Sequence, residues 1–192
     1  MKIALFFGSY NPIHIGHLII ANYIAETQGV EKVWLVVSPH NPLKEQASLL
    51  NEYDRLHLVN LAIDGNFKLK ASSVEFKLPK PSYTIDTLTH LKEMHPEHEF
   101  ELIMGGDNLA SIKKWKNYEI ILKNHPIIVY RRPGFDIPSD LKGNIRVLDV
   151  PLLEISSSFI RDSIKNGLSM KYFLPEAVEK YISEMSIFKS TL

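Results

Sequence analysis

Two histidines, His14 and His17, stand three residues apart at the predicted start of a helix. At this spacing both imidazole rings can lie on one face of the helix. The first turn of a helix also has free N–H groups and a partial positive charge, which together bind phosphate. Gly16, between the histidines, leaves room for a bulky group against the backbone. These residues indicate an anion site, with a polar loop and helix cap as the alternative. Zinc is disfavoured because no third ligand lies at useful spacing.

The residues before the histidines form a predicted turn between a strand and this helix. The apolar run 3–7 ends at Gly8, whose missing Cβ lets the backbone turn tightly and approach a ligand. Ser9 and Tyr10 follow, and the Asn-Pro dipeptide at 11–12 fixes the exit from the strand. The junction therefore combines a glycine turn, a proline and two histidines directly before a helix.

A second candidate anion site lies in the segment after the last predicted strand. Ser156 is suited to cap a helix, and neighbouring hydroxyls add donors to the free N–H groups of the helix start. Arg161, one turn further, can reach back to a phosphate with its planar guanidinium. An ordinary capped helix with an exposed arginine is the alternative. The candidate set comprises Ile155, Ser156, Ser157, Ser158 and Arg161.

A third segment, from Gly105, ends a predicted strand and begins a helix. Asp107 can accept hydrogen bonds from ribose hydroxyls, or it can cap the helix. Trp115, eight residues later, can stack on a pyridine ring or belong to the core. The residue types alone leave both choices open.

Three further features have simple structural interpretations. Tyr83 and Thr84 stand at a capped helix start. Lys44 lies in a proline-rich loop, where a solvated surface lysine is the alternative to a phosphate contact. A loose histidine cluster fits a solvated helix end better than a metal site, and it comprises His90, His95 and His98.

Apolar runs alternate with helical periodicity along the chain. Strands are expected over 3–7, 33–37, 100–104, 127–130 and 145–148, with one or two short strands within 67–78. Helices are expected over 15–28, 51–64, 84–94, 108–123, 157–166 and 175–185. This alternation predicts one α/β domain over 1–192, a Rossmann-like open parallel sheet with helices on both faces, and a short helical appendage from about residue 168. Ligands of such sheets bind beyond the carboxyl ends of the strands.

Composition narrows the function classes. The 22 basic and 22 acidic side chains of the 192 residues balance, so no global field holds nucleic acid, and an anion must be bound by a local cluster. Without cysteine there is no disulfide and no thiolate nucleophile. No apolar stretch reaches the length of a membrane span, and the short N-terminal apolar run does not fit a signal peptide. We expect a cytoplasmic protein without nucleic-acid or membrane partners, and a homo-oligomer is left open.

The motifs resemble a known family. His14-Ile15-Gly16-His17 matches the H-x-G-H signature of the nucleotidyltransferase superfamily, which also includes class I aminoacyl-tRNA synthetases. The stretch 8–17 looks like nicotinate-mononucleotide adenylyltransferases, with Phe7 where that family usually has a second glycine. The segment 155–161 is similar to their I-S-S-T-x-I-R motif, by which they bind ATP phosphates, with Ser158 in place of threonine.

The resemblance extends to the remaining candidate segments. Residues 81–88 are similar to S-Y-T-x-D-T-L, where the backbone around the threonine receives the nicotinate carboxylate. The loop with Lys44 is similar to P-H-x-P-H-K, with Leu43 for histidine, and Lys116 stands where an aromatic residue often follows the tryptophan.

The resemblance implies adenylyl transfer from ATP to nicotinate mononucleotide, which gives nicotinate adenine dinucleotide and pyrophosphate in NAD biosynthesis. It assigns catalysis to His14, His17, Lys44 and Arg161. It assigns ATP binding to Gly8, Ser9, Tyr10, Gly16, His17, Gly105, Asp107, Ile155, Ser156, Ser157, Ser158 and Arg161. It assigns nicotinate mononucleotide to Ser9, Lys44, Tyr83, Thr84, Asp107 and Trp115. Mg²⁺ would be held mainly by the ATP phosphates, with no dedicated protein metal site.

Other acceptors and other classes of protein remain as alternatives. Pantetheine-phosphate adenylyltransferases and cytidylyltransferases share the first motif, and the segments 81–88 and 105–115 favour nicotinate over them. A non-catalytic nucleotide-binding or RNA-binding module derived from a synthetase would also keep the H-x-G-H loop. The short chain, the zero net charge and the lack of a K-M-S-K-S sequence count against the RNA-binding module.

Overall fold

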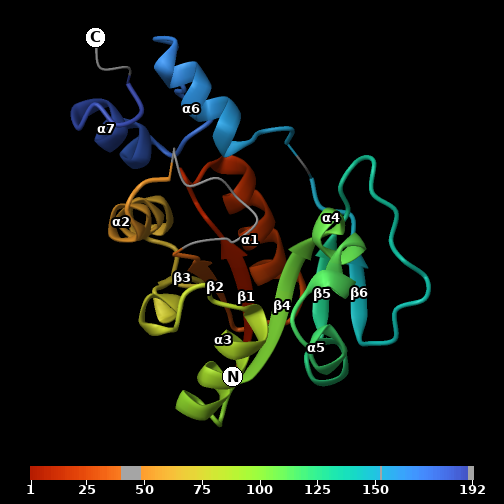
Figure 1. The fold of residues 1–192 in the computed structure, drawn as a ribbon. Helices are drawn as coiled ribbons and strands as arrows, with labels where there is room; N and C mark the ends of the chain where they lie inside the picture. Colours follow the sequence, from red (N-terminus) through yellow and green to blue (C-terminus); the bar gives the residue numbers. More distant parts are fainter. Residues whose placement is uncertain (40–48, 152, 190–192) are drawn as a thin grey trace.

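The apolar runs of the sequence form one parallel six-stranded sheet. The computed structural model describes residues 1–39, 49–151 and 153–189 (Figure 1). The strands are β1 (Lys2–Gly8), β2 (Lys32–Val37), β3 (Leu69–Ser72), β4 (Glu99–Gly105), β5 (Ile127–Tyr130) and β6 (Ile145–Leu148). Their order across the sheet is β3-β2-β1-β4-β5-β6, and every neighbouring pair is parallel. All carboxyl ends therefore lie along the same edge.

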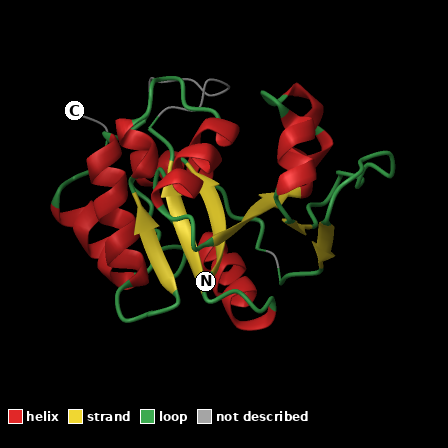
Figure 2. Cartoon of the chain, turned by 90° about the horizontal axis from the view of Figure 1, so that it is seen from below, coloured by secondary structure: helices red, strands yellow, loops and turns green. Residues whose placement is uncertain are grey.

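Helices cover both faces of the sheet, as the sequence predicts (Figure 2). They are α1 (Ile15–Thr27), α2 (Glu52–Ile63), α3 (Thr84–Met94), α4 (Gly106–Ala110), α5 (Tyr118–Asn124), α6 (Ser157–Lys165) and α7 (Glu176–Glu184), with 3₁₀ helices η1 (Val74–Lys77) and η2 (Ile112–Lys114). The Rossmann-like fold class is confirmed.

Alternating side chains of β1 enter two separate cores because successive residues of a strand point to opposite faces. Ala4 and Phe6 pack with α1, α2, α6 and α7, whereas Ile3 and Leu5 pack with α3, α4 and α5. All four are at most 4% exposed. Such double burial explains why this strand reads as a continuous apolar run rather than an alternating one.

One expected strand region is confirmed, and one expected helix is divided. The region 67–78 holds one strand, β3, followed by the 3₁₀ helix η1. The helical stretch expected over 108–123 is divided into α4, η2 and α5, with α4 starting at Gly106. The chain leaves the helical conformation at Trp115, and Asn117 adopts a left-handed conformation (φ 52°) before α5. Asparagine tolerates this conformation better than most residues do, so the break is compatible with its sequence.

The C-terminal region contributes to the main core. Val178 and Ile182 of α7 are 0% and 3% exposed, and His57 of α2 packs edge-on against Tyr181, with ring centroids 4.7 Å apart. The backbone carbonyl of Phe173 accepts a hydrogen bond from Ile15 N–H at 3.0 Å, at the first residue of α1. Within the described residues, no helix has the length and apolar character that a membrane crossing needs.

Candidate active site

The turn after β1 is held in shape by Tyr10. Its backbone is left-handed (φ 46°), and its ring folds back over Gly8, so a Cβ on that glycine would lie 2.7 Å from Tyr10 Cζ. The hydroxyl donates to the carbonyl of Phe6 at 2.6 Å, and the residue is 2% exposed. A side chain at position 8 would therefore collide with the Tyr10 ring, and this packing is sufficient to explain the glycine. The Tyr10 ring is therefore part of the packing of this turn and is not available to a nucleotide.

The two predicted histidines lie together at the start of α1. His14 is the N-cap residue, and its backbone N–H donates to His17 Nδ1 at 3.3 Å. The ring centroids are 3.8 Å apart. A Cβ on Gly16 would lie 3.1 Å from His14 Nδ1, so the room that this glycine leaves is taken by the first imidazole. The spacing thus places both rings on one side of the helix start, as expected.

His14 is 5% exposed, and burial is the main reason why its pKa falls to about 4. The positive charge of Arg132 lowers this pKa further. The imidazole is therefore neutral at neutral pH. An arriving phosphate group would oppose both effects, since an anion favours the charged imidazolium.

The start of α6 reaches the turn after β1. Ser156 caps the helix by accepting from Phe159 N–H at 3.1 Å, and the Ser157 hydroxyl donates to the carbonyl of Pro12 at 2.9 Å. Arg161 Nη1 donates to the carbonyl of Asn11 at 2.8 Å. The two anion-binding segments predicted from distant parts of the sequence are therefore adjacent in the structure.

Asp107 lies in the first turn of α4, beside the end of β5. The N-cap of α4 is Gly105, so the alternative that Asp107 caps this helix is wrong. A Cβ on Gly105 would meet Asp107 Oδ1 and would lie 3.2 Å from the ring of Tyr130, so a side chain there would displace the carboxylate. The carboxylate lies 3.6 Å from Arg132 Nε. Sequence reasoning missed Arg132, although the Arg-Arg pair directly after a buried strand is a signal for a cation at the carboxyl edge.

The start of α3 carries the predicted Tyr83 and Thr84. Tyr83 is the N-cap, and no described side chain caps the first turn. Lys116 Nζ lies 4.9 Å from the centre of the Tyr83 ring and 2.9 Å from Asp86 Oδ2. The lysine that replaces the expected aromatic residue thus brings a cation to the helix start. Trp115 is half-buried and packs against the core on this face.

The remaining residues singled out in the sequence are not part of the arrangement described above. Lys44 and Leu43 lie outside the described residues. Phe7, which stands where the family usually has a glycine, packs against the core that contains α3.

Two of the three predicted clustered histidines meet at the opposite edge of the sheet. His95 and His98, just before β4, stack with ring centroids 5.2 Å apart, and Glu97 Oε1 lies 3.1 Å from His98 Nδ1. His90 is not part of this group. Because the carboxyl edge lies at the far end of β4, these residues are separate from the candidate active site.

Comparison with known proteins gives a consistent result. The sequence model of the cytidylyltransferase-like family matches residues 5–163. A probable nicotinate-nucleotide adenylyltransferase of Flavobacterium psychrophilum is 54% identical, over 98% of this chain and 100% of the relative. One of Bacteroides fragilis with the same name is 48% identical, over 96% and 92%.

A solved structure supports the fold. Nicotinic acid mononucleotide adenylyltransferase of Plasmodium falciparum, complexed with NaAD, superposes with a TM-score of 0.83 at 21% identity, covering 97% of each chain. At this identity the likeness concerns the fold, whereas the sequence relatives above define the family. The chain belongs to the cytidylyltransferase-like family, as a member of its nicotinate-nucleotide adenylyltransferase group.

Proposed function

We propose that this protein transfers the adenylyl group of ATP to nicotinate mononucleotide and releases pyrophosphate. The observation that carries the proposal is the junction of two helix starts: His14 and His17 begin α1, and Arg161 of α6 donates to Asn11 in the turn before it. Two helix N-termini with a histidine pair and an arginine suit a triphosphate. The names of the close relatives agree with this activity.

The nucleotide half-site, as we define it, comprises residues 8–17 and 155–161. We assign the α-phosphate to the two histidines, and the β- and γ-phosphates to Arg161 and the hydroxyls of 156–158. Arg161 donates to the Asn11 carbonyl and, at 3.3 Å, to Ser158 Oγ. These contacts direct the guanidinium toward the loop, where a phosphate can replace one or both acceptors.

The acceptor half-site comprises the α3 start at Tyr83 and Thr84, together with Trp115 and Asp107. The uncapped N–H groups of α3 suit a carboxylate. Lys116, which is paired with Asp86, places an ammonium group beside Tyr83, where it can interact with the carboxylate of nicotinate but gains less from the neutral amide of nicotinamide. We assign the pyridine ring to Trp115 and the ribose to Asp107. Lys44, outside the described residues, is assigned to the phosphates of either substrate.

The reaction is in-line attack by the acceptor phosphate on the α-phosphorus of ATP. A phosphate oxygen of the acceptor forms the new P–O bond while the bond to pyrophosphate breaks. The acceptor phosphate is largely ionised at neutral pH, since its second pKa is about 6, so no general base is needed. Catalysis then rests on alignment and on donors aimed at the charge that develops in the transition state.

Mg²⁺, when bound, would neutralise phosphate charge. Asp107, the one acidic residue among the proposed substrate contacts, is paired with Arg132. With one paired carboxylate, these residues fit a Mg²⁺ ion held mainly by the triphosphate and by water better than one held by several protein carboxylates.

A cytoplasmic location is also part of the proposal, and cell fractionation tests it.

The direct test is an assay of pyrophosphate release with a panel of substrates. Purified protein is given ATP or CTP together with nicotinate mononucleotide, nicotinamide mononucleotide or phosphopantetheine. We expect rapid turnover with ATP and nicotinate mononucleotide, and slower turnover with every other pair. Preference for CTP or phosphopantetheine would replace this assignment by one of the related transferases, and binding without pyrophosphate release would show a non-catalytic nucleotide-binding protein.

A further inference from the structure

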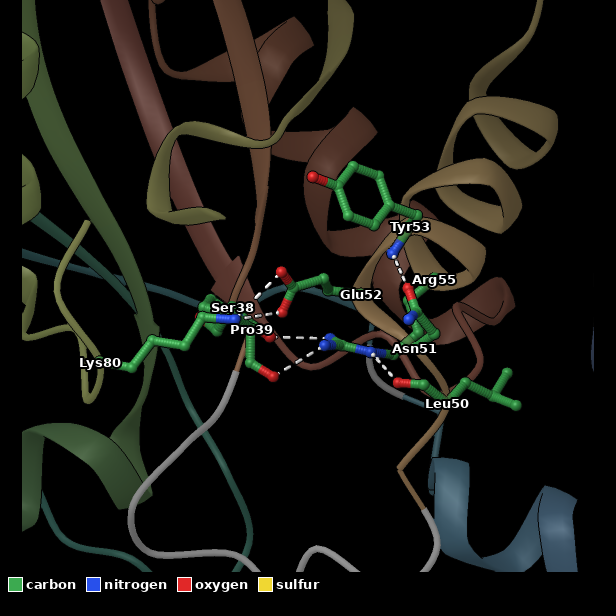
Figure 3. Close-up of polar contacts among 8 residues, drawn as sticks. All are labelled: Ser38, Pro39, Leu50, Asn51, Glu52, Tyr53, Arg55 and Lys80. Carbon is green, nitrogen blue, oxygen red and sulfur yellow. Dashed lines mark hydrogen bonds and ion pairs between the residues drawn. The ribbon is translucent and has the colours of Figure 1, made fainter. Parts of the chain in front are cut away.

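Arg55 of α2 is a fully buried cation whose hydrogen bonds go to backbone carbonyls. Its exposed fraction is 0%. Nε donates to Leu50 O at 3.0 Å, and Nη2 to Pro39 O at 2.9 Å (Figure 3). Nη1 donates to Ser38 O at 2.8 Å and to Ser9 O at 2.5 Å. A guanidinium removed from water is stable only when its donors are satisfied, and four of its five N–H groups are used here.

Three of the four acceptors of Arg55 lie just after two adjacent strands. Ser9 follows β1 and belongs to the nucleotide half-site, whereas Ser38 follows β2. Leu50, just before α2, adds a second link, because its N–H donates to Asn11 Oδ1 at 3.2 Å. The start of α2 therefore fixes the turn after β1 relative to the end of β2.

Ser38 continues the connection toward the acceptor half-site. Its carbonyl accepts from Arg55, and its hydroxyl lies beside the carboxyl of Glu75, which is 3% exposed and whose pKa it lowers. Glu75 accepts a hydrogen bond from Thr87 Oγ1 of α3 at 2.7 Å, and the Ser82 hydroxyl, just before that helix, also lowers its pKa. Ser82 and Thr87 flank the helix start at which we place the nicotinate carboxylate.

We propose that Arg55, Ser38 and Glu75 form a positioning network that sets the distance between the nucleotide half-site and the acceptor half-site. The inference rests on the proposed function, in which both half-sites must be filled at once. None of the three residues is assigned a substrate contact. They act through Ser9 on one side, and through Ser82 and Thr87 on the other.

The chemistry makes this distance critical. Transfer requires the acceptor oxygen and the α-phosphorus to approach in line, and a misplacement of about 1 Å can cost about a hundredfold in rate. Each half-site is built locally at a helix start, so it can bind its own ligand when the network is broken. Loss of the network should therefore lower kcat more than it weakens the binding of either substrate.

The experiment uses Ser38→Ala and Arg55→Lys, with Val59→Ala as the matched control. Ser38→Ala removes the linking hydroxyl with little change in volume, so the protein is expected to fold. Arg55→Lys keeps the charge, but one ammonium cannot reach all of the carbonyls. Val59 lies one turn along the same helix and is 0% exposed, so its truncation destabilises α2 without touching the network.

Both test variants should lower kcat at least tenfold. KM for nicotinate mononucleotide, and the Kd of ATP measured separately, should change less than about threefold. Val59→Ala should retain the parent kcat within about twofold, although its Tm falls. In the double variant the combined loss should be at least about threefold smaller than the product of the single losses, because the two residues share one network. Parent-like kcat in Ser38→Ala and Arg55→Lys would overturn the inference.

Amide hydrogen exchange separates this inference from the activity. In Ser38→Ala, the segments 9–12 and 82–87 should both exchange faster than in the parent protein, and in Val59→Ala they should not. Acceleration of one segment alone contradicts the coupling whatever reaction the protein performs. Absence of turnover in the parent protein contradicts the proposed function instead, and leaves the exchange comparison decisive for the network.

Discussion

Arg161 of α6 donates a hydrogen bond to the backbone carbonyl of Asn11, at 2.8 Å, across 150 positions of sequence. This bond joins the last functional helix start to the turn that precedes the first. The same guanidinium is our candidate ligand for the β- and γ-phosphates. Its position therefore depends on the turn that shapes the histidine site.

Arg161→Lys should lower kcat/KM for ATP by about tenfold to a hundredfold. A lysine ammonium lacks the planar set of donors with which the guanidinium can bind the Asn11 carbonyl and a phosphate at the same time. Thermal unfolding should shift little, because the residue lies in the partly exposed first turns of α6. Steady-state kinetics at fixed, saturating nicotinate mononucleotide test this. Lys165→Ala, in the last turn of the same helix, is the matched control.

His17→Ala should reduce kcat by about 10² or more, which is the scale of losing one preorganised transition-state donor. Circular dichroism checks that α1 remains folded. A variant within a few-fold of the parent would falsify the assignment of the histidine pair to the α-phosphate.

The buried His14 makes stability depend on pH. Its folded pKa, about 4, lies below the unfolded value of 6.5. Above pH 6.5 both states are neutral and its contribution is fully present. As the pH falls from 6.5 toward 4, the unfolded state binds the proton first and stability is lost. Between pH 7 and pH 5 we expect a loss of about 2 kcal/mol from this residue.

Urea unfolding of the parent and of His14→Asn at both pH values isolates this effect. The burial of Glu75 raises its pKa, so its contribution falls as the pH rises, and comparison with the variant removes that opposing change. Equal pH dependence in parent and variant would show that His14 titrates normally.

Lys116→Ala should raise KM for nicotinate mononucleotide by about twofold to fivefold, the range expected for an exposed charge. It should leave KM for ATP unchanged. The preference for nicotinate mononucleotide over nicotinamide mononucleotide, measured as the ratio of their kcat/KM values, should become smaller. Lys114→Ala, at the neighbouring exposed position in η2, is the control. An equal change of KM for nicotinate mononucleotide and nicotinamide mononucleotide would contradict this role of Lys116.

Gly8→Ala should destabilise the fold by about 1–3 kcal/mol, as overpacking of a filled core does. The new methyl group would lie 2.7 Å from the ring of Tyr10. Denaturant unfolding measures the loss, and Tyr10→Leu in the same background should restore part of it by vacating the ring's position. If Gly8→Ala unfolds like the parent, the contact between ring and glycine is not tight in solution.

Much of the architecture follows from patterns within the sequence. The run 3–7 is apolar throughout because β1 is buried on both faces, and strands alternate with helices because parallel strands need crossovers. The candidate segments around residues 8, 105 and 156 all follow strands. Since parallel strands end at one edge, sequence alone predicts that they meet.

The features that the sequence does not predict are tertiary contacts between residues far apart in the chain or between side chains and backbone. Arg55 reads as one polar residue in an amphipathic helix, because its partners are backbone carbonyls, which every sequence supplies. The burial of Tyr10 and the use of the Gly16 space by His14 likewise depend on tertiary packing. The hydrophobic periodicity that predicts helices and strands does not predict such contacts.

The hydrogen bond from Ile15 N–H to the carbonyl of Phe173 bears on biosynthesis. It places a late segment of the chain against the first residue of α1, where the histidine pair stands. A nascent polypeptide on the ribosome can pair its early strands, but this contact must wait until residue 173 has left the exit tunnel. The helix start that carries the histidine pair is therefore completed by a segment made long after it, when the strands of the sheet have already been synthesised.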